Sequence, residues 1–134
     1  MIGFKVRLGD WMDQIQIECA PFLAGPPTSI GGKIFLTPRG GMGGGVQEQY
    51  CLRDEVITAV QFQWTDRQDK VYSINFACSN IHTWSRHDLL LTGTGIPSLI
   101  KRPWYTCPYG EVATGLQGNY GKHVNALGLI CGPW

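Results

Sequence analysis

The feature that most constrains this chain is a strand pattern that recurs three times and ends in cysteine each time. The cysteines are Cys19, Cys78 and Cys131, and apolar residues precede each of them at the same three places. Two of these places alternate, which is the spacing of a β-strand with one buried face. The three segments are residues 12–19, 71–78 and 124–131. The chain is therefore expected to contain three diverged copies of one β-motif.

A second strand-like segment precedes each cysteine-ended segment, so each copy predicts a hairpin. These first strands are residues 4–8, 56–62 and 112–116. Repeats of this length, joined by turn-rich connectors, indicate three similar sheets around a pseudo-threefold axis. A propeller fits less well, because its blades usually carry four strands over ~40–50 residues and number at least four. We predict one all-β domain over residues 1–134, with repeats at approximately 1–38, 39–91 and 92–134.

Composition excludes several classes of protein. The 134 residues are 43% apolar and 16% charged, which is unlike a disordered chain. The net charge of +1 lacks the basic excess of a nucleic-acid-binding protein. No apolar run approaches the ~18 residues that span a bilayer. The first seven residues do not resemble a signal peptide, so either the chain is not secreted by that route, or a leader was removed and Met1 was added.

Five cysteines follow the repeat. Cys51 and Cys107 precede the second and third hairpins, and we predict disulfides Cys51–Cys78 and Cys107–Cys131. The equivalent partner of Cys19 would lie before the start of the chain, which leaves Cys19 as a free, buried thiol. The alternative is five reduced cysteines that pack as small apolar residues. No pair has the spacing of a zinc site, and no metal or cofactor is expected.

The turn of the first hairpin contains the first candidate binding residues. It reads Gly9, Asp10, Trp11, Met12 and Asp13. A glycine-permitted turn can point several backbone N–H groups in one direction, and a carboxylate can accept hydrogen bonds from two hydroxyls. Neighbouring hydroxyls are characteristic of sugars, and an aromatic ring could cover the apolar face of one. The alternative is an ordinary hairpin turn with a solvated aspartate.

Two further segments extend this hypothesis. The first is a loop almost without side chains, formed by Gly40, Gly41, Met42, Gly43 and Gly44. It is either a linker or a place where backbone approaches a ligand closely. The second is the turn of the third hairpin, where Gly121, Lys122, His123 and Asn125 stand at the positions of the first turn. This turn is a second candidate sugar site, with an amide in place of the acid.

These loops resemble those of the jacalin-related lectins. The glycine loop matches the family's GGxGG motif, and Gly9 with Asp13 matches its GxxxD motif. The resemblance implies a β-prism of three four-stranded Greek-key sheets, in which both loops hold one monosaccharide of mannose or galactose type. The GxxxD motif comes first here, whereas the family has it near the end, which implies a circular permutation. The resemblance thus requires Gly41 to lie near Asp13.

The placement of the cysteines resembles a different β-prism protein, the vitelline membrane outer layer protein. Residues 104–110 are similar to its W-x-x-C-P-x-G motif, and the likeness covers the second and third copies. This resemblance supports the fold. It also supports an alternative function, a structural or adhesive module without sugar binding.

An enzyme is not expected. His82, His87 and Asp88 lie close together in sequence, but no nucleophile motif accompanies them. A glycosidase needs two carboxylates across a groove, and no such pair is evident. The prediction is a glycan-binding lectin without catalytic residues. It is expected to form a homo-oligomer, because multivalency strengthens weak single sites. The predicted disulfides favour a secreted or extracellular setting.

Overall fold

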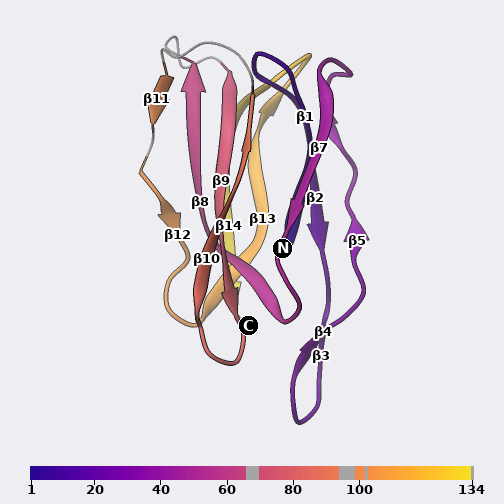
Figure 1. Cartoon of the computed structure of the whole chain (residues 1–134), viewed down its shortest axis with the longest axis vertical. Helices are drawn as coiled ribbons and strands as arrows, with labels where there is room; N and C mark the ends of the chain where they lie inside the picture. The colour runs from indigo at the N-terminus through magenta and orange to yellow at the C-terminus, as the bar shows by residue number, and fades with distance from the viewer. Residues whose placement is uncertain (66–69, 94–98, 102, 134) are drawn as a thin grey trace.

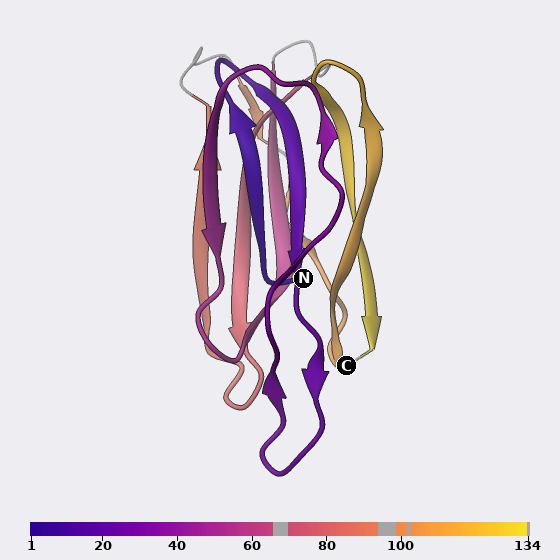
Figure 2. The same cartoon turned by 90° about the vertical axis from the view of Figure 1, so that its right-hand side faces the viewer.

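The structure is a computed structural model of the chain. It describes residues 1–65, 70–93, 99–101 and 103–133, apart from the side chains of residues 65, 99–101, 125 and 126. The described residues form antiparallel β-sheets and no helix (Figures 1 and 2). Within these ranges there is consequently no helix with the length and apolar character needed to cross a membrane.

The first sheet is built on the first predicted hairpin. Strand β1 (Gly3–Leu8) pairs antiparallel with β2 (Met12–Cys19). Alternation along β1 buries Phe4 and Val6, whereas Lys5 is only half-buried. The outer strands follow this hairpin in the chain: β5 (Ile34–Phe35) and β6 (Arg39–Gly40) pair with β2, and β7 (Gly45–Tyr50) pairs with β1.

The second sheet repeats this arrangement around the second predicted hairpin. Its strands are β8 (Glu55–Thr65) and β9 (Val71–Asn80) in the centre, β10 (Arg86–Thr92) beside β9, and β11 (Leu99–Lys101) with β12 (Tyr105–Thr106) beside β8. Here too, the outer strands follow the hairpin in the chain. In the part of the chain that the structure describes, each of these two sheets contains five strands.

The third sheet contains only the third predicted hairpin among the described residues. Its strands are β13 (Glu111–Tyr120) and β14 (Val124–Pro133). The resemblance to jacalin-related lectins implied four strands here, so this sheet differs from the prediction. A separate small hairpin of β3 (Phe22–Leu23) and β4 (Ser29–Ile30) projects from the lower end of the molecule in Figure 2. The first sheet extends to Tyr50, past the predicted repeat boundary at residue 38.

The three hairpins surround one apolar core. Phe4 of the first sheet meets Phe76 of the second edge to face, with ring centroids 5.1 Å apart. Both rings are fully buried, as is Phe62. Burying a side chain of this size contributes about 1.5–3 kcal/mol. Backbone bonds also join the copies, since the Ile57 N–H donates to the Met1 carbonyl at 3.0 Å.

Two disulfides join neighbouring sheets. The bonds are Cys51–Cys78 and Cys107–Cys131, each with its Cα atoms 5.6 Å apart, and both match the pairing predicted from the sequence. Cys19 carries a free thiol, as predicted. The prediction that it is buried was wrong: Cys19 is half-buried, because it packs against the core from the end of β2 and not within it.

Candidate functional site

The candidate loops gather at one end of the molecule. The turn between β1 and β2, the loop between β6 and β7, and the turn between β13 and β14 all lie at the top of Figures 1 and 2. The Gly41 N–H donates to the Asp13 carbonyl at 2.7 Å. The requirement that Gly41 lie near Asp13 is therefore met by the geometry.

The Asp13 carboxylate lies directly against the glycine loop. A Cβ atom added to Gly43 would stand 3.0 Å from Asp13 Oδ2, and one added to Gly9 would stand 3.9 Å from the same oxygen. A Cβ atom on Gly40 would collide with the Asp13 carbonyl oxygen. Gly40 and Gly44 also have φ of +120° and +68°, which side chains with a Cβ rarely adopt. The glycines thus permit the close approach of this loop to the carboxylate.

Side chains of the first sheet hold the glycine loop in place. Arg7 donates from Nη1 to the carbonyls of Met42 and Gly44, at 3.2 and 3.3 Å. Gln14 donates from Nε2 to the Gly41 carbonyl at 3.2 Å. These bonds fix the loop beside the turn that carries Asp13, without using the Asp13 side chain.

The third hairpin contributes to the same place. His123 Nδ1 lies 2.5 Å from Asp13 Oδ1, and the Trp11 indole Nε1 lies 2.8 Å from the same His123 nitrogen. The space beside Gly41 is bounded by the Lys122 backbone, whose carbonyl oxygen a Cβ on Gly41 would strike. Residues that sequence reasoning assigned to a separate second site therefore adjoin the first one.

The two contacts of His123 Nδ1 are mutually exclusive as hydrogen bonds. Trp11 can only donate, so that bond requires an unprotonated Nδ1. A hydrogen bond from His123 Nδ1 to the Asp13 carboxylate requires a proton on the same nitrogen. The imidazole can thus satisfy either the indole or the carboxylate, and its protonation decides which one.

Exposure differs among the predicted site residues. The Asp13 side chain is 10% exposed and that of His123 is 29% exposed. Met12 is fully buried in the core, so only its backbone can face a ligand, whereas Met42 is 73% exposed. Asp10 is also exposed. The remaining predicted residue of the second site, Asn125, has its side chain outside the described part of the structure.

Residues near Trp11 complete this end of the molecule. The Lys70 ammonium lies 4.3 Å from the centroid of the Trp11 ring. Gly93 packs against the carbonyls of Gly9 and Asp10, where an added Cβ would stand 2.8 and 3.2 Å away. All three copies therefore supply residues around the Gly9–Asp13 turn.

The histidines noted near Asp88 lie elsewhere. His82 is on the loop after β9, at the opposite end of the second sheet from its hairpin turn, and its Nε2 lies 3.8 Å from Asp54 Oδ2. His87 Nδ1 lies 3.1 Å from Glu55 Oε2, near the Cys78 sulfur. That sulfur is committed to a disulfide and cannot act as a thiolate ligand. Both histidines thus have structural partners.

A charged cluster on the first sheet was missed by sequence reasoning. Glu18 is fully buried, and Lys33 Nζ lies 3.3 Å from Glu18 Oε2 and 3.7 Å from Glu48 Oε2. Burial, and next the neighbouring Glu48 carboxyl, raise the pKa of Glu18 from 4.5 to about 7, although Lys33 acts in the opposite direction. The neighbouring Glu18 carboxyl is the main cause that lowers the pKa of Glu48. Of the two carboxyls, Glu18 therefore holds a proton more readily than Glu48.

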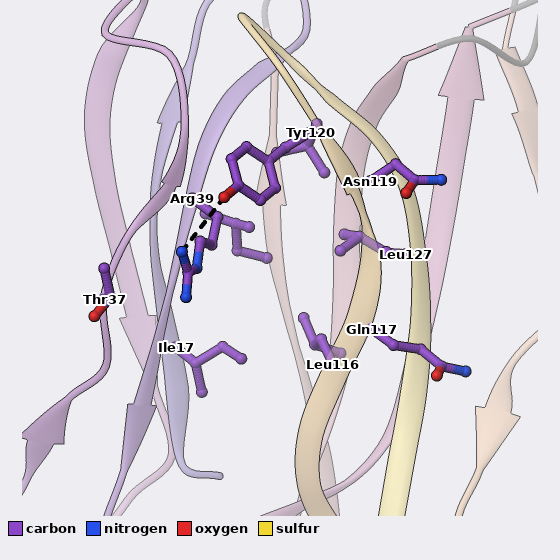
Figure 3. A pocket seen from close by; sticks show the side chains of 11 residues that line it. Ile17, Thr37, Arg39, Leu116, Gln117, Asn119, Tyr120 and Leu127 are labelled. Carbon is purple, nitrogen blue, oxygen red and sulfur yellow. Dashed lines mark hydrogen bonds between the residues drawn. The ribbon is translucent and has the colours of Figure 1, made fainter.

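A cavity of about 350 Å³ lies between the first sheet and the third hairpin (Figure 3). Apolar side chains line its floor, including Ile17, Leu116 and Leu127. Arg39 donates from Nη1 to the Tyr120 hydroxyl at 3.3 Å across it. Sequence patterning gave no sign of this cavity, because its walls come from two different copies.

Three repeated antiparallel hairpins packed around one core define the β-prism class of fold. Comparison with solved structures agrees. The chain is similar to the agglutinin of Calystegia sepium, with a TM-score of 0.62 and 15% identity over 100% of this chain and 83% of that chain. It is similar to the Calsepa lectin in complex with a biantennary N-glycan, with a TM-score of 0.62 and 16% identity over the same shares of both chains. The predicted jacalin-like β-prism fold is thus confirmed.

The other two comparisons found no relative. No protein-family model matches the chain, and no curated protein matches it. The likeness to the two lectin structures, at 15% and 16% identity, therefore concerns the fold.

Proposed function

We propose that this protein is a lectin that binds one monosaccharide unit of a glycan, of mannose or galactose type, where the Gly9–Asp13 turn meets the Gly40–Gly44 loop. The observation that carries the proposal is the position of the Asp13 carboxylate, which lies against Gly43 between two glycine-containing loops. A solved structure with the same fold, the Calsepa lectin, was determined with an N-glycan bound.

The chemistry of the site suits a sugar. A carboxylate can accept hydrogen bonds from two neighbouring hydroxyls, and charge-assisted bonds of this kind are stronger than neutral ones. The glycines let hydroxyls approach the backbone of the loop without hindrance from side chains. Trp11 offers an aromatic face, once Lys70 moves from its place over the ring.

His123 has a defined part in this proposal. It occupies one oxygen of Asp13 in the absence of sugar, so a hydroxyl that binds there takes the place of the imidazole. The imidazole can then accept the hydrogen bond of the Trp11 indole. His123 thus keeps the carboxylate paired until a sugar arrives.

One observation favours a second candidate function, a structural or adhesive module. The Asp13 side chain is only 10% exposed and already has a partner in His123. In that case the contact between Asp13 and His123 would tie the first and third hairpins together, and the glycines would serve only the packing of the loop.

Two further properties belong to the lectin proposal. The protein forms a homo-oligomer, because single monosaccharide sites bind weakly and several sites on one particle restore the affinity. It works in an oxidising, extracellular setting, which is where its two disulfides persist.

The test is binding of methyl mannosides and methyl galactosides by calorimetry, followed by a glycan array. Asp13→Asn is expected to weaken binding about 10- to 100-fold, because a hydrogen bond to a charged group contributes about 1.5–3 kcal/mol. Asp88→Asn is the control, since it removes an exposed acid on β10, outside the loops of the site, and should leave binding unchanged. Equal binding by Asp13→Asn and the parent would refute the site, and no binding by the parent would favour the structural module.

A further inference from the structure

Among the described residues, the third sheet has no counterpart of the outer strands that the other two sheets have. In those sheets β7 pairs with β1, and β12 pairs with β8, whereas among the described residues β13 pairs with β14 alone. Both strands of the third sheet are ten residues long, and after Glu111 neither contains a charged residue. Natural sheet edges are usually protected by charge, proline or a covering element, because their free N–H and C=O groups otherwise pair with other strands. The long, uncharged edge of β13 has no such protection within the described structure.

The cavity of Figure 3 lies where a strand paired with β13 would run. One wall is the edge of the first sheet at Thr37 and Arg39, and the other is β13 at Leu116 and Tyr120. At the equivalent junction between the first and second sheets, the outer strand β7 packs beside β10. The same arrangement between the third and first sheets would place an outer strand on β13 beside residues 34–40 of the first sheet. That strand would occupy the cavity.

The existing disulfides indicate how such a strand would end. Cys51 follows β7, its N–H donates to the Ile2 carbonyl at 2.7 Å, and its sulfur bonds to Cys78. Cys107 follows β12, and its N–H donates to the Thr58 carbonyl at 2.9 Å. Each outer strand thus ends in a cysteine that caps the first strand of its own hairpin and cross-links to the next hairpin.

Among the described residues, the third hairpin has no outer strand that ends in a cysteine. Thr114 corresponds to Thr58, because each is the extra residue where the register shifts in its hairpin. None of the described backbone N–H groups makes the equivalent bond to the Thr114 carbonyl. Cys19 corresponds to Cys78 at the end of its hairpin and carries a free thiol on a half-buried residue. The unpaired edge of β13, the cavity beside it and the free thiol of Cys19 are thus the three places that one further outer strand, ending in cysteine, would occupy.

We propose that the third hairpin docks a polypeptide segment of two short strands, the first against β14 and the second against β13, that ends in cysteine and forms a disulfide with Cys19. The segment is of the same kind as residues 34–51 and 86–107, which place one strand on each side of the first and second hairpins. Main-chain bonds to β13 and β14 supply the affinity, as in other cases of strand addition. The Cys19 thiolate attacks the segment's cysteine sulfur, held as a mixed disulfide with glutathione. The new S–S bond forms as the old one breaks, and glutathione leaves as its thiolate.

A second copy of the chain is a poorer occupant of this edge. Its cysteine-ended outer strands already belong to its own first and second sheets. The cysteines that end them, Cys51 and Cys107, are both committed to disulfides. A copy docked through its own β13 would bring no cysteine to Cys19.

The test uses the intact 134-residue protein and two synthetic peptides with the sequences of residues 34–51 and 86–107. Each peptide carries thionitrobenzoate on its cysteine, so attack by Cys19 releases a coloured thiolate and gives the rate directly. Two matched controls keep the same cysteine: a scrambled peptide, and a peptide N-methylated at alternate residues so that it cannot pair. Cys19→Ser protein controls for other attack. Light scattering of the protein alone reports its oligomeric state, and amide hydrogen exchange reports protection of β13.

At least one of the two peptides with an unscrambled sequence (native-order peptides) is expected to react with Cys19 at least tenfold faster than both controls. In the disulfide-linked product, amide hydrogen exchange along β13 should be slower than in the free protein. It is overturned if native-order, scrambled and N-methylated peptides react at the same rate. It is also overturned if the protein alone is a dimer in which β13 is already protected, because a second copy would then be the occupant.

Discussion

Replacing Glu18 with glutamine is expected to stabilise the fold at pH 8 and to remove a fall in stability between pH 4.5 and 7. Glu18 stands opposite Gly3 on β1, and Lys33 lies over it. Lys33 in turn rests on the Tyr50 ring, with Nζ 3.6 Å from its centroid. This cover leaves the Glu18 carboxyl fully buried, which disfavours its charged form.

The size of the effect follows from the pKa of Glu18, which is raised from 4.5 to about 7. Between these values the folded chain binds a proton that the unfolded chain has lost, so the free energy of unfolding falls as the pH rises. The stabilisation is fully present below pH 4.5 and is lost as the pH rises through 7. At 1.36 kcal/mol per unit, Glu18 alone corresponds to about 3 kcal/mol. Glu48, whose pKa is lowered, acts in the opposite direction, so the expected net change is about 1–3 kcal/mol.

Urea unfolding, followed by tryptophan fluorescence at several pH values with the disulfides intact, measures this directly. Glu18→Gln stays neutral at every pH, so its stability should lack the fall seen in the parent. Glu48→Gln is the matched control, because it removes the partner whose charge is favoured and should lower stability at neutral pH. Parallel pH profiles for the parent and Glu18→Gln would refute the reasoning, as would a large loss of stability in Glu18→Gln at pH 8.

Three further predictions concern the candidate site and the cross-links. Gly43→Ala should displace the Asp13 carboxylate and weaken sugar binding about tenfold in calorimetry, whereas Gly32→Ala, where an added Cβ meets nothing within 4 Å, should not. Cys51→Ala should lower the free energy of unfolding by about 3 kcal/mol in urea titrations, since its bond closes a 27-residue separation. Asp13→Ala should remove the carboxylate that competes for His123 Nδ1, so the Trp11 indole N–H should donate to this nitrogen more fully and its NMR signal should move downfield. An unmoved signal would show that the two contacts of His123 do not compete.

Much of the fold was predictable because its signals are local. A period-two pattern of apolar residues defines a strand within a few residues, and three copies of that pattern identified the three central hairpins. The disulfides Cys51–Cys78 and Cys107–Cys131 followed from comparing the copies. The importance of Gly40 and Gly44 could also be predicted from the sequence, because a backbone with positive φ favours glycine whatever surrounds it.

The candidate site was predictable only in part. Comparison of the three copies within the sequence selected the two loops, but it assigned the turn at His123 to a separate site. Its contact with Asp13 joins residues that lie more than a hundred positions apart, and no local pattern encodes such a contact. Met12 belongs to the predicted turn, yet its side chain is in the core, because a register shift next to Leu8 pairs Leu8 with Met12 where the hairpin turns.

The sequence by itself thus determined the three-copy architecture, the pairing of four cysteines and the two loops that are candidates for sugar binding. Only the tertiary structure decided which copies meet. It placed His123 on Asp13, buried Glu18 beneath Lys33, and left the edge of β13 open beside a cavity. The physical reason is that strand period and turn chemistry act within a few residues. Contacts between copies depend on the twist and packing of whole sheets, which no single segment specifies.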